Sequence, residues 1–209
     1  MKPLQERIHD KVFSHRTGGG EDGKETLVNR ISSMIQCLEY IDKDFYDKYI
    51  TAPASTKFHG VYDGGLVDHS VNVVVSLLEW RCAHKDAGLT VEDCILIGLL
   101  HDLCKVELYT KNENGKYTYD KELAKHHAKE SIRIITKKLN VKLTRQQRVL
   151  ILLHMSGWQN KEDEKALSFL DRLWLASIKH IKLLQAVNWA DMKATQDEIV
   201  EELKINQRS

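Results

Sequence analysis

Apolar and polar positions alternate along most of the chain with the period of an α-helix. Residues 25–50 show the pattern clearly, because apolar side chains recur at a spacing near 3.6 residues, which predicts one amphipathic helix or two in succession. A second helix is expected from about Leu66 to His84. A third is expected to begin at Thr90, a residue type that caps helix N-termini, and to continue through the apolar run CILIGLLHDLCKV.

Residues 106–120 are the one candidate for β-structure. The segments VELYTK and KYTYD alternate, and they flank Asn-Glu-Asn-Gly, which is typical of a hairpin turn. Helical patterns resume at about 121–139, 144–155 and 166–204, the last in two pieces, whereas proline, glycine and small residues predict a loop over 51–65. The pattern therefore predicts an all-α helical bundle with one small β-hairpin near residues 106–120.

Composition adds few constraints to this picture. A chain of 209 residues suits one helical domain over 25–209, preceded by an N-terminal arm and a glycine-rich loop over 1–24. The net charge of +1 predicts neither a nucleic-acid nor a membrane partner. Four cysteines without CxxC spacing predict buried free thiols in a reducing cytoplasm. The N-terminus lacks the apolar stretch of a signal peptide, and no apolar run is long enough to span a membrane, so a cytoplasmic protein is expected.

Ten histidines invite a search for a metal site, and two of them precede an aspartate. His9-Asp10 lies in a polar segment, is assigned no function and serves as an internal control. His101-Asp102 instead interrupts the apolar run CILIGLLHDL, which predicts a helix buried on most sides. Because burial of an ionised carboxylate is costly, Asp102 needs either a cation or a set of hydrogen-bond donors. The alternative is a structural His-Asp pair that caps a neighbouring helix.

Helical periodicity directs further side chains toward the same interior. His69, His154 and Asp191 each lie on an apolar helix face. In the doublet His126-His127, the second histidine lies on an apolar face and the first shares a face with charged residues, so His126 is assigned to the surface. Several inward polar residues on separate helices are difficult to satisfy by pairing alone. The predicted metal ligands are His69, His101, Asp102, His127, His154 and Asp191.

These residue types indicate the chemistry of the site. Neutral imidazoles and carboxylates suit divalent metals, and the expected ion is Mn, Fe, Co, Ni, Zn or Mg. Six ligands favour two metals over one, and a short aspartate carboxylate can bridge two ions. Such a site activates water near neutral pH and binds phosphoryl oxygens.

The sequence resembles the HD phosphohydrolase superfamily over roughly residues 50–195. His69, His101-Asp102 and Asp191 follow the order of the H…HD…D signature of that superfamily. Flanking strings sharpen the resemblance: PASTKFHGVYDGGLVDHSVNV, HDLCKVELY, KHHAKES, LLHMSGW and NWADMKAT. They look like an HD hydrolase group common in phage and gut-bacterial genomes, and are similar to HD domains attached to bacterial 3′–5′ exoribonucleases. The resemblance implies an HD-type helical fold and a metal-dependent phosphohydrolase.

The resemblance also implies how the ligands divide between two metals. It assigns the signature residues to the first metal, with the aspartate of the HD pair as the bridging carboxylate, and it assigns His127 and His154 to the second. The chain departs from some nucleotidase members at Lys105, where those members carry an acidic residue. A mononuclear 5′-nucleotidase mechanism is therefore not the expected one.

Basic residues near the ligands are candidates for catalysis beside Asp102. Lys105 lies one turn beyond the histidine of the HD pair, where it either reaches a phosphate oxygen or interacts with the helix dipole. The resemblance implies that the loop before the first ligand lines the substrate side. Lys57 and His59 in this loop are therefore expected to bind phosphate or to protonate the leaving oxygen.

Aromatic residues could add contacts to a base. Trp158 either stacks on a base or packs within its loop, which is the simpler interpretation. The hairpin tyrosines Tyr109, Tyr117 and Tyr119 either wall a nucleotide pocket or pack across the strands, and cross-strand packing is favoured. The predicted substrate-binding residues are Ser55, Thr56, Lys57, His59, Lys105 and Trp158.

The leading functional hypothesis is a phosphohydrolase that cleaves a phosphoester in a nucleotide or short oligonucleotide through metal-activated water. A monoester, a triphosphate and a phosphodiester are all open as substrates. The alternative is a non-catalytic HD domain that senses a nucleotide or binds RNA, and intact ligand positions favour the enzyme over it. A purely structural module would require the inward histidines and aspartates to be coincidental. The sequence carries no code for the oligomeric state or for the particular nucleotide.

Overall fold

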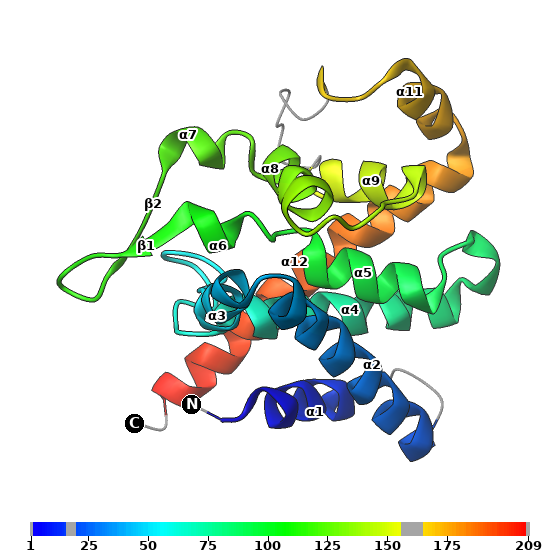
Figure 1. Cartoon of the computed structure of the whole chain (residues 1–209). Coiled ribbons are helices and arrows are strands. Elements are labelled where there is room, and N and C mark those ends of the chain that lie inside the picture. Colours follow the sequence, from blue (N-terminus) through cyan, green and yellow to red (C-terminus); the bar gives the residue numbers. More distant parts are fainter. Residues whose placement is uncertain (1, 16–19, 156–164, 208–209) are drawn as a thin grey trace.

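The computed structural model describes residues 2–15, 20–155 and 165–207. Helices predominate, as expected, and the one sheet in these ranges is a two-stranded hairpin (Figure 1). The first elements are α1 (Leu4–Ser14), α2 (Gly20–Ile41), α3 (Lys43–Thr51), α4 (Gly65–Ala83), the 3-10 helix η1 (Lys85–Ala87) and α5 (Val91–Leu100). The remaining elements are α6 (Lys105–Leu108), β1 (Tyr109–Lys111), β2 (Tyr117–Tyr119), α7 (Lys121–Ala124), α8 (His127–Arg133), the π-helical turn η2 (Ile134–Lys138), α9 (Arg145–Leu152), α11 (Phe169–Leu175) and α12 (Ile178–Asn206).

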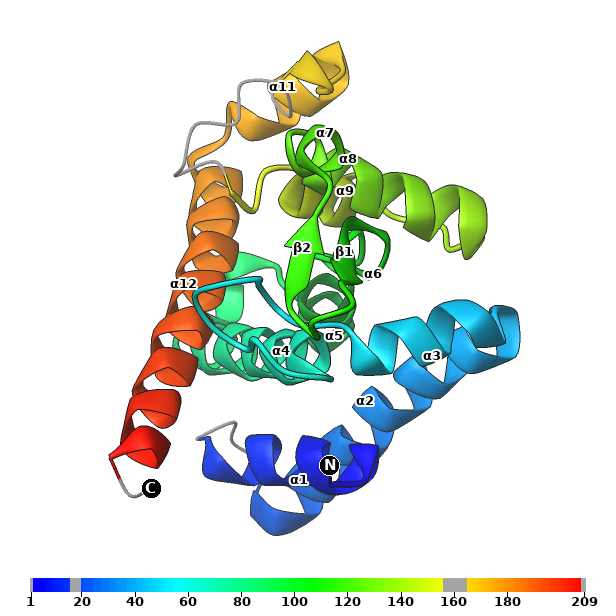
Figure 2. The ribbon, with the colours of Figure 1, turned by 90° about the vertical axis from the view of Figure 1, so that its left-hand side faces the viewer.

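Helix α4 forms the centre of the core, because nearly every side chain in its first fourteen residues is buried. It packs against α5, α1 and α3, and against the long helix α12, which runs along one side of the molecule (Figure 2). Gly98 allows α5 to approach α4 closely. A Cβ atom at Gly98 would lie 2.5 Å from Cγ2 of Val74 and 2.7 Å from its backbone nitrogen. The polar residues that α4 and α5 carry are therefore brought close together.

Helix α1 belongs to this core rather than to a separate arm. Ile8 is buried, and the guanidinium of Arg7 donates to the carboxylate of Asp68 (Nε to Oδ1, 3.0 Å) and to the carbonyl of Gly64 (2.6 Å). These bonds join α1 to the N-terminal turn of α4. The prediction that the glycine-rich loop extends to residue 24 is also wrong, because α2 begins at Gly20. Acidic residues in the first turn of α2 stabilise a helix N-terminus there.

Most predicted helices are confirmed, but several are divided. Residues 25–50 fall into α2 and α3, which are separated at Asp42, whose carboxylate accepts the Phe45 N–H as an N-cap. Thr90 caps α5 through a capping box, as expected from its position. Helix α5 ends at Leu100, and residues 101–104 form turns instead of continuing the helix. The helix expected over 121–139 is divided into α7, α8 and η2.

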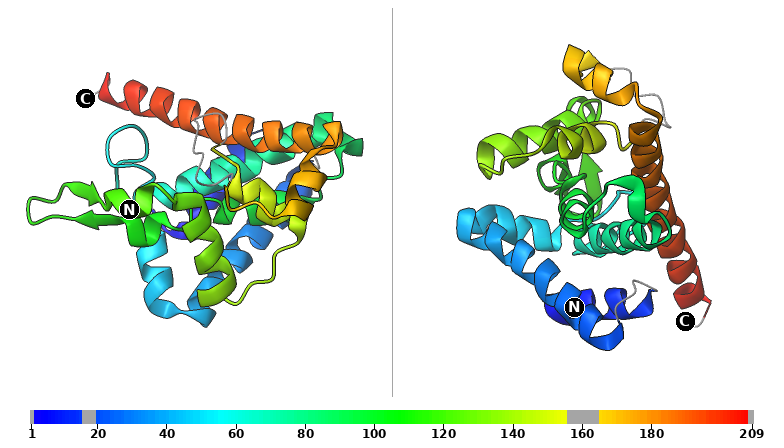
Figure 3. Two further views of the ribbon diagram at one scale, coloured as in Figure 1. Left: turned by 90° about the horizontal axis from the view of Figure 1, so that it is seen from above. Right: turned by 90° about the vertical axis from the view of Figure 1, so that its right-hand side faces the viewer.

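The predicted hairpin is confirmed over shorter strands than the pattern indicated. Tyr109 pairs with Tyr119, and Lys111 pairs with Tyr117, in an antiparallel register. The hairpin projects from the helical body, as the left view of Figure 3 shows. Asp63, in the loop before α4, accepts hydrogen bonds from Lys111 (2.8 Å) and from the Tyr117 hydroxyl. These contacts fix the hairpin against that loop.

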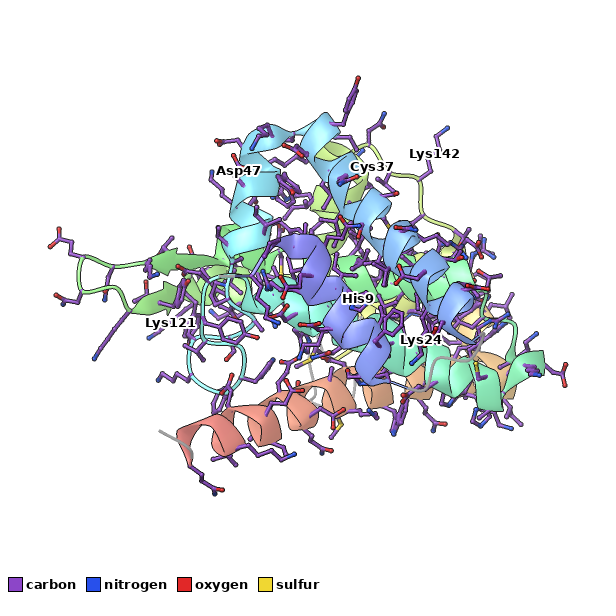
Figure 4. The ribbon with its side chains drawn as sticks, turned by 90° about the horizontal axis from the view of Figure 1, so that it is seen from below. His9, Lys24, Cys37, Asp47, Lys121 and Lys142 are labelled. Atoms are coloured by element: carbon purple, nitrogen blue, oxygen red, sulfur yellow. The ribbon has the colours of Figure 1, made fainter. Side chains whose placement is uncertain are left out.

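The prediction that the four cysteines are buried is only partly correct. Cys94 and Cys104 are buried, whereas Cys37 and Cys82 are exposed on helix faces that turn away from the core; Figure 4 labels Cys37 on α2. In the described ranges, no helix combines the length and apolar character that crossing a membrane requires.

Candidate metal centre

The structure brings the six predicted ligands together at one buried place, from five separate parts of the fold. His69, His101, Asp102 and His154 are almost fully buried, and the other two are partly buried. The six ligands are His69 on α4, His101 and Asp102 directly after α5, His127 at the start of α8, His154 after α9, and Asp191 on α12.

Asp191 connects the first group of ligands. Its Oδ1 lies 3.1 Å from Nε2 of His69 and 3.8 Å from Nε2 of His101. Oδ2 of Asp102 lies 3.4 Å from the same His101 nitrogen. Two imidazole nitrogens and two carboxylates thus converge on one point, a donor set that suits a divalent transition metal.

The other carboxylate oxygen of Asp102 faces a second group of ligands. Oδ1 lies 3.4 Å from Nε2 of His154 and 3.9 Å from Nε2 of His127. These two histidine nitrogens are 3.3 Å apart. One oxygen of Asp102 faces His101, and the other faces His127 and His154. The carboxylate therefore has the placement of a group that bridges two ions.

Backbone carbonyls orient two of the histidines. Nδ1 of His101 lies 2.9 Å from the carbonyl oxygen of Gly98, and Nδ1 of His154 lies 2.7 Å from that of Ile151. Since a carbonyl only accepts, Nδ1 carries the proton in both rings and Nε2 directs its lone pair into the cluster. Metal-binding histidines are typically held in this way.

Two buried atoms of the cluster have no hydrogen-bond partner within the described ranges. They are Nε2 of His101 and Oδ1 of Asp102. Unsatisfied buried polar atoms are rare and costly in folded proteins. One of these atoms belongs to each ligand group, where a metal ion would accept its lone pair, so the donor sets and the unpaired atoms agree.

Lys105 compensates part of the negative charge. Its Nζ lies 2.6 Å from Oδ2 of Asp102, and both side chains are largely buried. Burial alone would raise the pKa of Asp102, but Lys105 and His101 hold it well below its usual range. Burial likewise opposes the charge of Lys105, yet Asp102 raises the pKa of this ammonium above its ordinary value. The carboxylate is therefore ionised and ready to bind a cation.

Glu198 is a functional candidate that the sequence interpretation missed. It is buried on α12, and its carboxylate lies 3.2 Å from Nδ1 of His69 and accepts a hydrogen bond of 2.8 Å from the Asn72 amide. Burial would lower the pKa of His69, but Glu198 and Asp191 raise it to about 10. The signal was present in the sequence, because Glu198 follows Asp191 by seven residues and so shares its helix face.

His59 lies beside this carboxylate, in the loop before α4. Its Nε2 is 3.9 Å from Oε2 of Glu198, and its ring lies 4.9 Å from that of His69 between centroids. Neither ring nitrogen has a hydrogen-bond partner within the described residues. Burial, with His69 and Lys105 nearby, lowers the pKa of His59 to about 4. A neutral imidazole with two free nitrogens is thus available next to the ligands.

The other predicted site residues lie farther out. Ser55 is buried, and its hydroxyl oxygen accepts the backbone N–H groups of residues 57–59, which fixes the loop. Thr56 and Lys57 line surface cavities, and Lys57 is exposed outside the buried cluster. The structure thus brings His59, but not Lys57, to the ligands. Trp158 lies outside the described residues.

The second His-Asp pair lies on a different part of the molecule. His9 and Asp10 belong to α1, where their side chains are about half exposed (Figure 4). His126 is partly buried but takes no part in the candidate metal groups found among the described residues, which include His127. The dipeptide alone therefore does not define the centre; the surrounding helices do.

Comparison with known proteins agrees with this geometry. Residues 66–195, more than half of the chain, match the HD domain family, so the chain belongs to this family. A dihydroneopterin 2′,3′-cyclic phosphate phosphodiesterase from Methanocaldococcus jannaschii is 35% identical over 71 residues, which are 32% of this chain and 28% of that protein. The chain thus aligns with less than a third of this relative's length. No solved structure is significantly similar to the chain.

Proposed function

We propose that the chain is a metal-dependent phosphohydrolase that cleaves a phosphoester in a nucleotide, with two divalent ions held by the six ligands. The observation that carries this proposal is the buried cluster in which Asp102 faces two separate groups of histidines. The similarity to the Methanocaldococcus jannaschii cyclic phosphate phosphodiesterase favours a phosphodiester substrate over a monoester or a triphosphate.

Each residue near the cluster has a separate task in this proposal. Bound divalent metals would supply an activated water molecule and neutralise charge on the phosphoryl group. Lys105 binds a phosphoryl oxygen with its ammonium. His59, whose ring nitrogens have no partner among the described residues, donates an N–H hydrogen bond to a phosphoryl oxygen. Lys57 contributes positive charge at the edge of the site.

The test is to measure metal content and to screen nucleotide phosphoesters with added Mn²⁺. Asp102→Ala should lose both metals and at least about a hundredfold in rate, because its carboxylate faces both ligand groups. Asp10→Ala is the matched control, since it changes the aspartate of the exposed His-Asp pair and should keep full activity. Metal uptake without hydrolysis of any phosphoester would instead support a non-catalytic domain that senses a nucleotide or binds RNA.

A further inference from the structure

A cavity of about 310 Å³ lies between the loop before α4 and the β-hairpin. Lys57 and Phe58 line it from the loop, and Tyr109 and Tyr119 line it from the strands. The loop and the hairpin lie next to each other in Figures 1 and 2. The volume falls within the range of about 300–1,000 Å³ that is usual for small-molecule sites.

Exposed aromatic rings distinguish this cavity from an ordinary packing gap. Phe58 is 76% exposed and Tyr119 is 45% exposed. Tyr109 and Tyr119 are directly opposite in the hairpin register, so their side chains share one face of the two strands. Cross-strand packing accounts for the contact between the two tyrosines, but it does not cover Phe58 or the outer ring of Tyr119.

Both walls of the cavity are held in place. Ser55 accepts three backbone N–H groups of its own loop, so the turn that carries Phe58 is fixed. On the other side, Asp63 accepts hydrogen bonds from Lys111 and Tyr117 and holds the hairpin. A preformed cavity binds a ligand with less loss of conformational entropy than a flexible surface would.

Two wall residues have neighbours at the metal centre. Phe58 is followed by His59, which lies 3.9 Å from the carboxylate of Glu198. Burial raises the pKa of the Tyr109 phenol, and the positive charge of nearby Lys105 opposes this rise. Lys105 in turn contacts Asp102. A ligand in the cavity would thus present its next atoms to His59 and Lys105.

We infer that this cavity binds the base of the nucleotide substrate, which stacks on Tyr119 and Phe58 while its phosphate reaches the metal centre. The inference rests on the proposed function and specifies it: the enzyme selects nucleotides over base-free sugar phosphates. Stacking on aromatic side chains tolerates any base, because every base has a π-face. The cavity therefore accounts for a preference for nucleotides as a class and not for one base.

The test compares AMP with ribose 5-phosphate, which differ only in the base. Calorimetric titration of the manganese-loaded protein should show that AMP binds about tenfold more tightly. Tyr119→Ala and Phe58→Ala should each reduce this ratio toward one, whereas Tyr119→Phe should keep it. Tyr40→Ala is the matched control, because Tyr40 is 97% exposed on α2. If phosphate is released during titration, the ratio of kcat/KM values for the two ligands replaces the ratio of affinities.

Two outcomes would overturn the inference. One is equal binding of AMP and ribose 5-phosphate by the unchanged protein. The other is an AMP preference that survives in both alanine variants. Neither outcome depends on hydrolysis, so the two proposals can fail separately. If the protein prefers AMP through Tyr119 and Phe58 but hydrolyses no phosphoester, the proposed base site is supported and the proposed enzymatic activity is refuted.

Discussion

Nδ1 of His69 lies 3.2 Å from Oε1 of Glu198, so a buried carboxylate on α12 orients a candidate metal ligand on α4. Loss of such an orienting group usually weakens metal binding by about 10–100-fold. Glu198→Ala should show a loss of this size, and Glu198→Gln a smaller one, because an amide oxygen can still accept the Nδ1 proton. Competition with a chromophoric chelator measures both affinities.

Glu201 provides the control for this experiment. It lies on the same helix but is exposed, where it pairs with Lys11 at the surface. Glu201→Ala should bind metal like the unchanged protein. Equal affinity in the Glu198 and Glu201 variants would show that Glu198 has no influence on the metal.

The contact between Lys105 and Asp102 predicts an effect on metal-free stability. Lys105→Met leaves the buried carboxylate without its ammonium partner, and removing one partner of a buried pair costs about 3–5 kcal/mol. Mn²⁺ should then stabilise the variant more than it stabilises the unchanged protein, since the ion replaces the missing charge. Urea unfolding with and without Mn²⁺ measures the difference.

Lys48→Met is the comparison, because Lys48 pairs with Asp44 on the exposed surface. It should change the free energy of unfolding by less than about 1 kcal/mol. The role given to Lys105 is wrong if Mn²⁺ stabilises the Lys105 variant and the unchanged protein by the same amount.

The partly buried ring of His127 predicts a loss of stability in acid. Burial, reinforced by His154, lowers its pKa from 6.5 to about 4 in the folded protein. As pH falls, His127 is therefore protonated in the unfolded chain before it is protonated in the folded protein. The free energy of unfolding is unaffected by this group above about pH 6.5 and decreases as pH falls from 6.5 toward 4. Between pH 7.5 and pH 5, the free energy of unfolding of the metal-free protein should decrease by about 2 kcal/mol more than that of His127→Gln.

Urea unfolding at the two pH values, with metal removed by a chelator, measures this difference. Comparison with His127→Gln removes the contributions to the pH dependence that the two proteins share. Identical pH dependence in the two proteins would mean that the His127 ring is not kept neutral by its surroundings.

Gly98→Ala tests the close packing of α4 against α5. The added Cβ would lie 2.5 Å from Val74, so the helices must separate at a cost of about 1–3 kcal/mol. Metal affinity should fall as well, because α4 carries His69 and α5 leads into His101. Ser33→Ala on the exposed face of α2 should change neither quantity. An unchanged urea midpoint for Gly98→Ala would contradict the packing described above.

Helices and the hairpin could be predicted because local periodicity and turn chemistry specify them. Their interruptions could not, since these depend on tertiary contacts. The break before His127, for example, positions that ring against His154, and nothing in the local pattern KELAKHHAKES marks it. The role of α1 was missed for the same reason: its polar sequence hides the buried pair of Arg7 and Asp68.

The candidate ligands were predictable because a polar residue on an apolar helix face has few structural explanations. Glu198 meets the same criterion, because it shares a helix face with Asp191, but it is a residue type outside the histidine and aspartate of the predicted ligand set. His59 and Glu198 both lie outside residues 66–195, the part that matches the HD family. A pocket wall was one of the two alternatives for the hairpin tyrosines. The opposite wall of the cavity could not be predicted, because it meets the tyrosines only when the hairpin docks on the loop through Asp63.

Helix α12 supplies Asp191 and Glu198, and it follows every other ligand-bearing element in the chain. On the ribosome, the four histidines and Asp102 emerge before either of these carboxylates. The nascent chain therefore carries an incomplete set of donors until α12 has been made and has docked on α4. Binding of a metal by all six donors would consequently follow assembly of the fold.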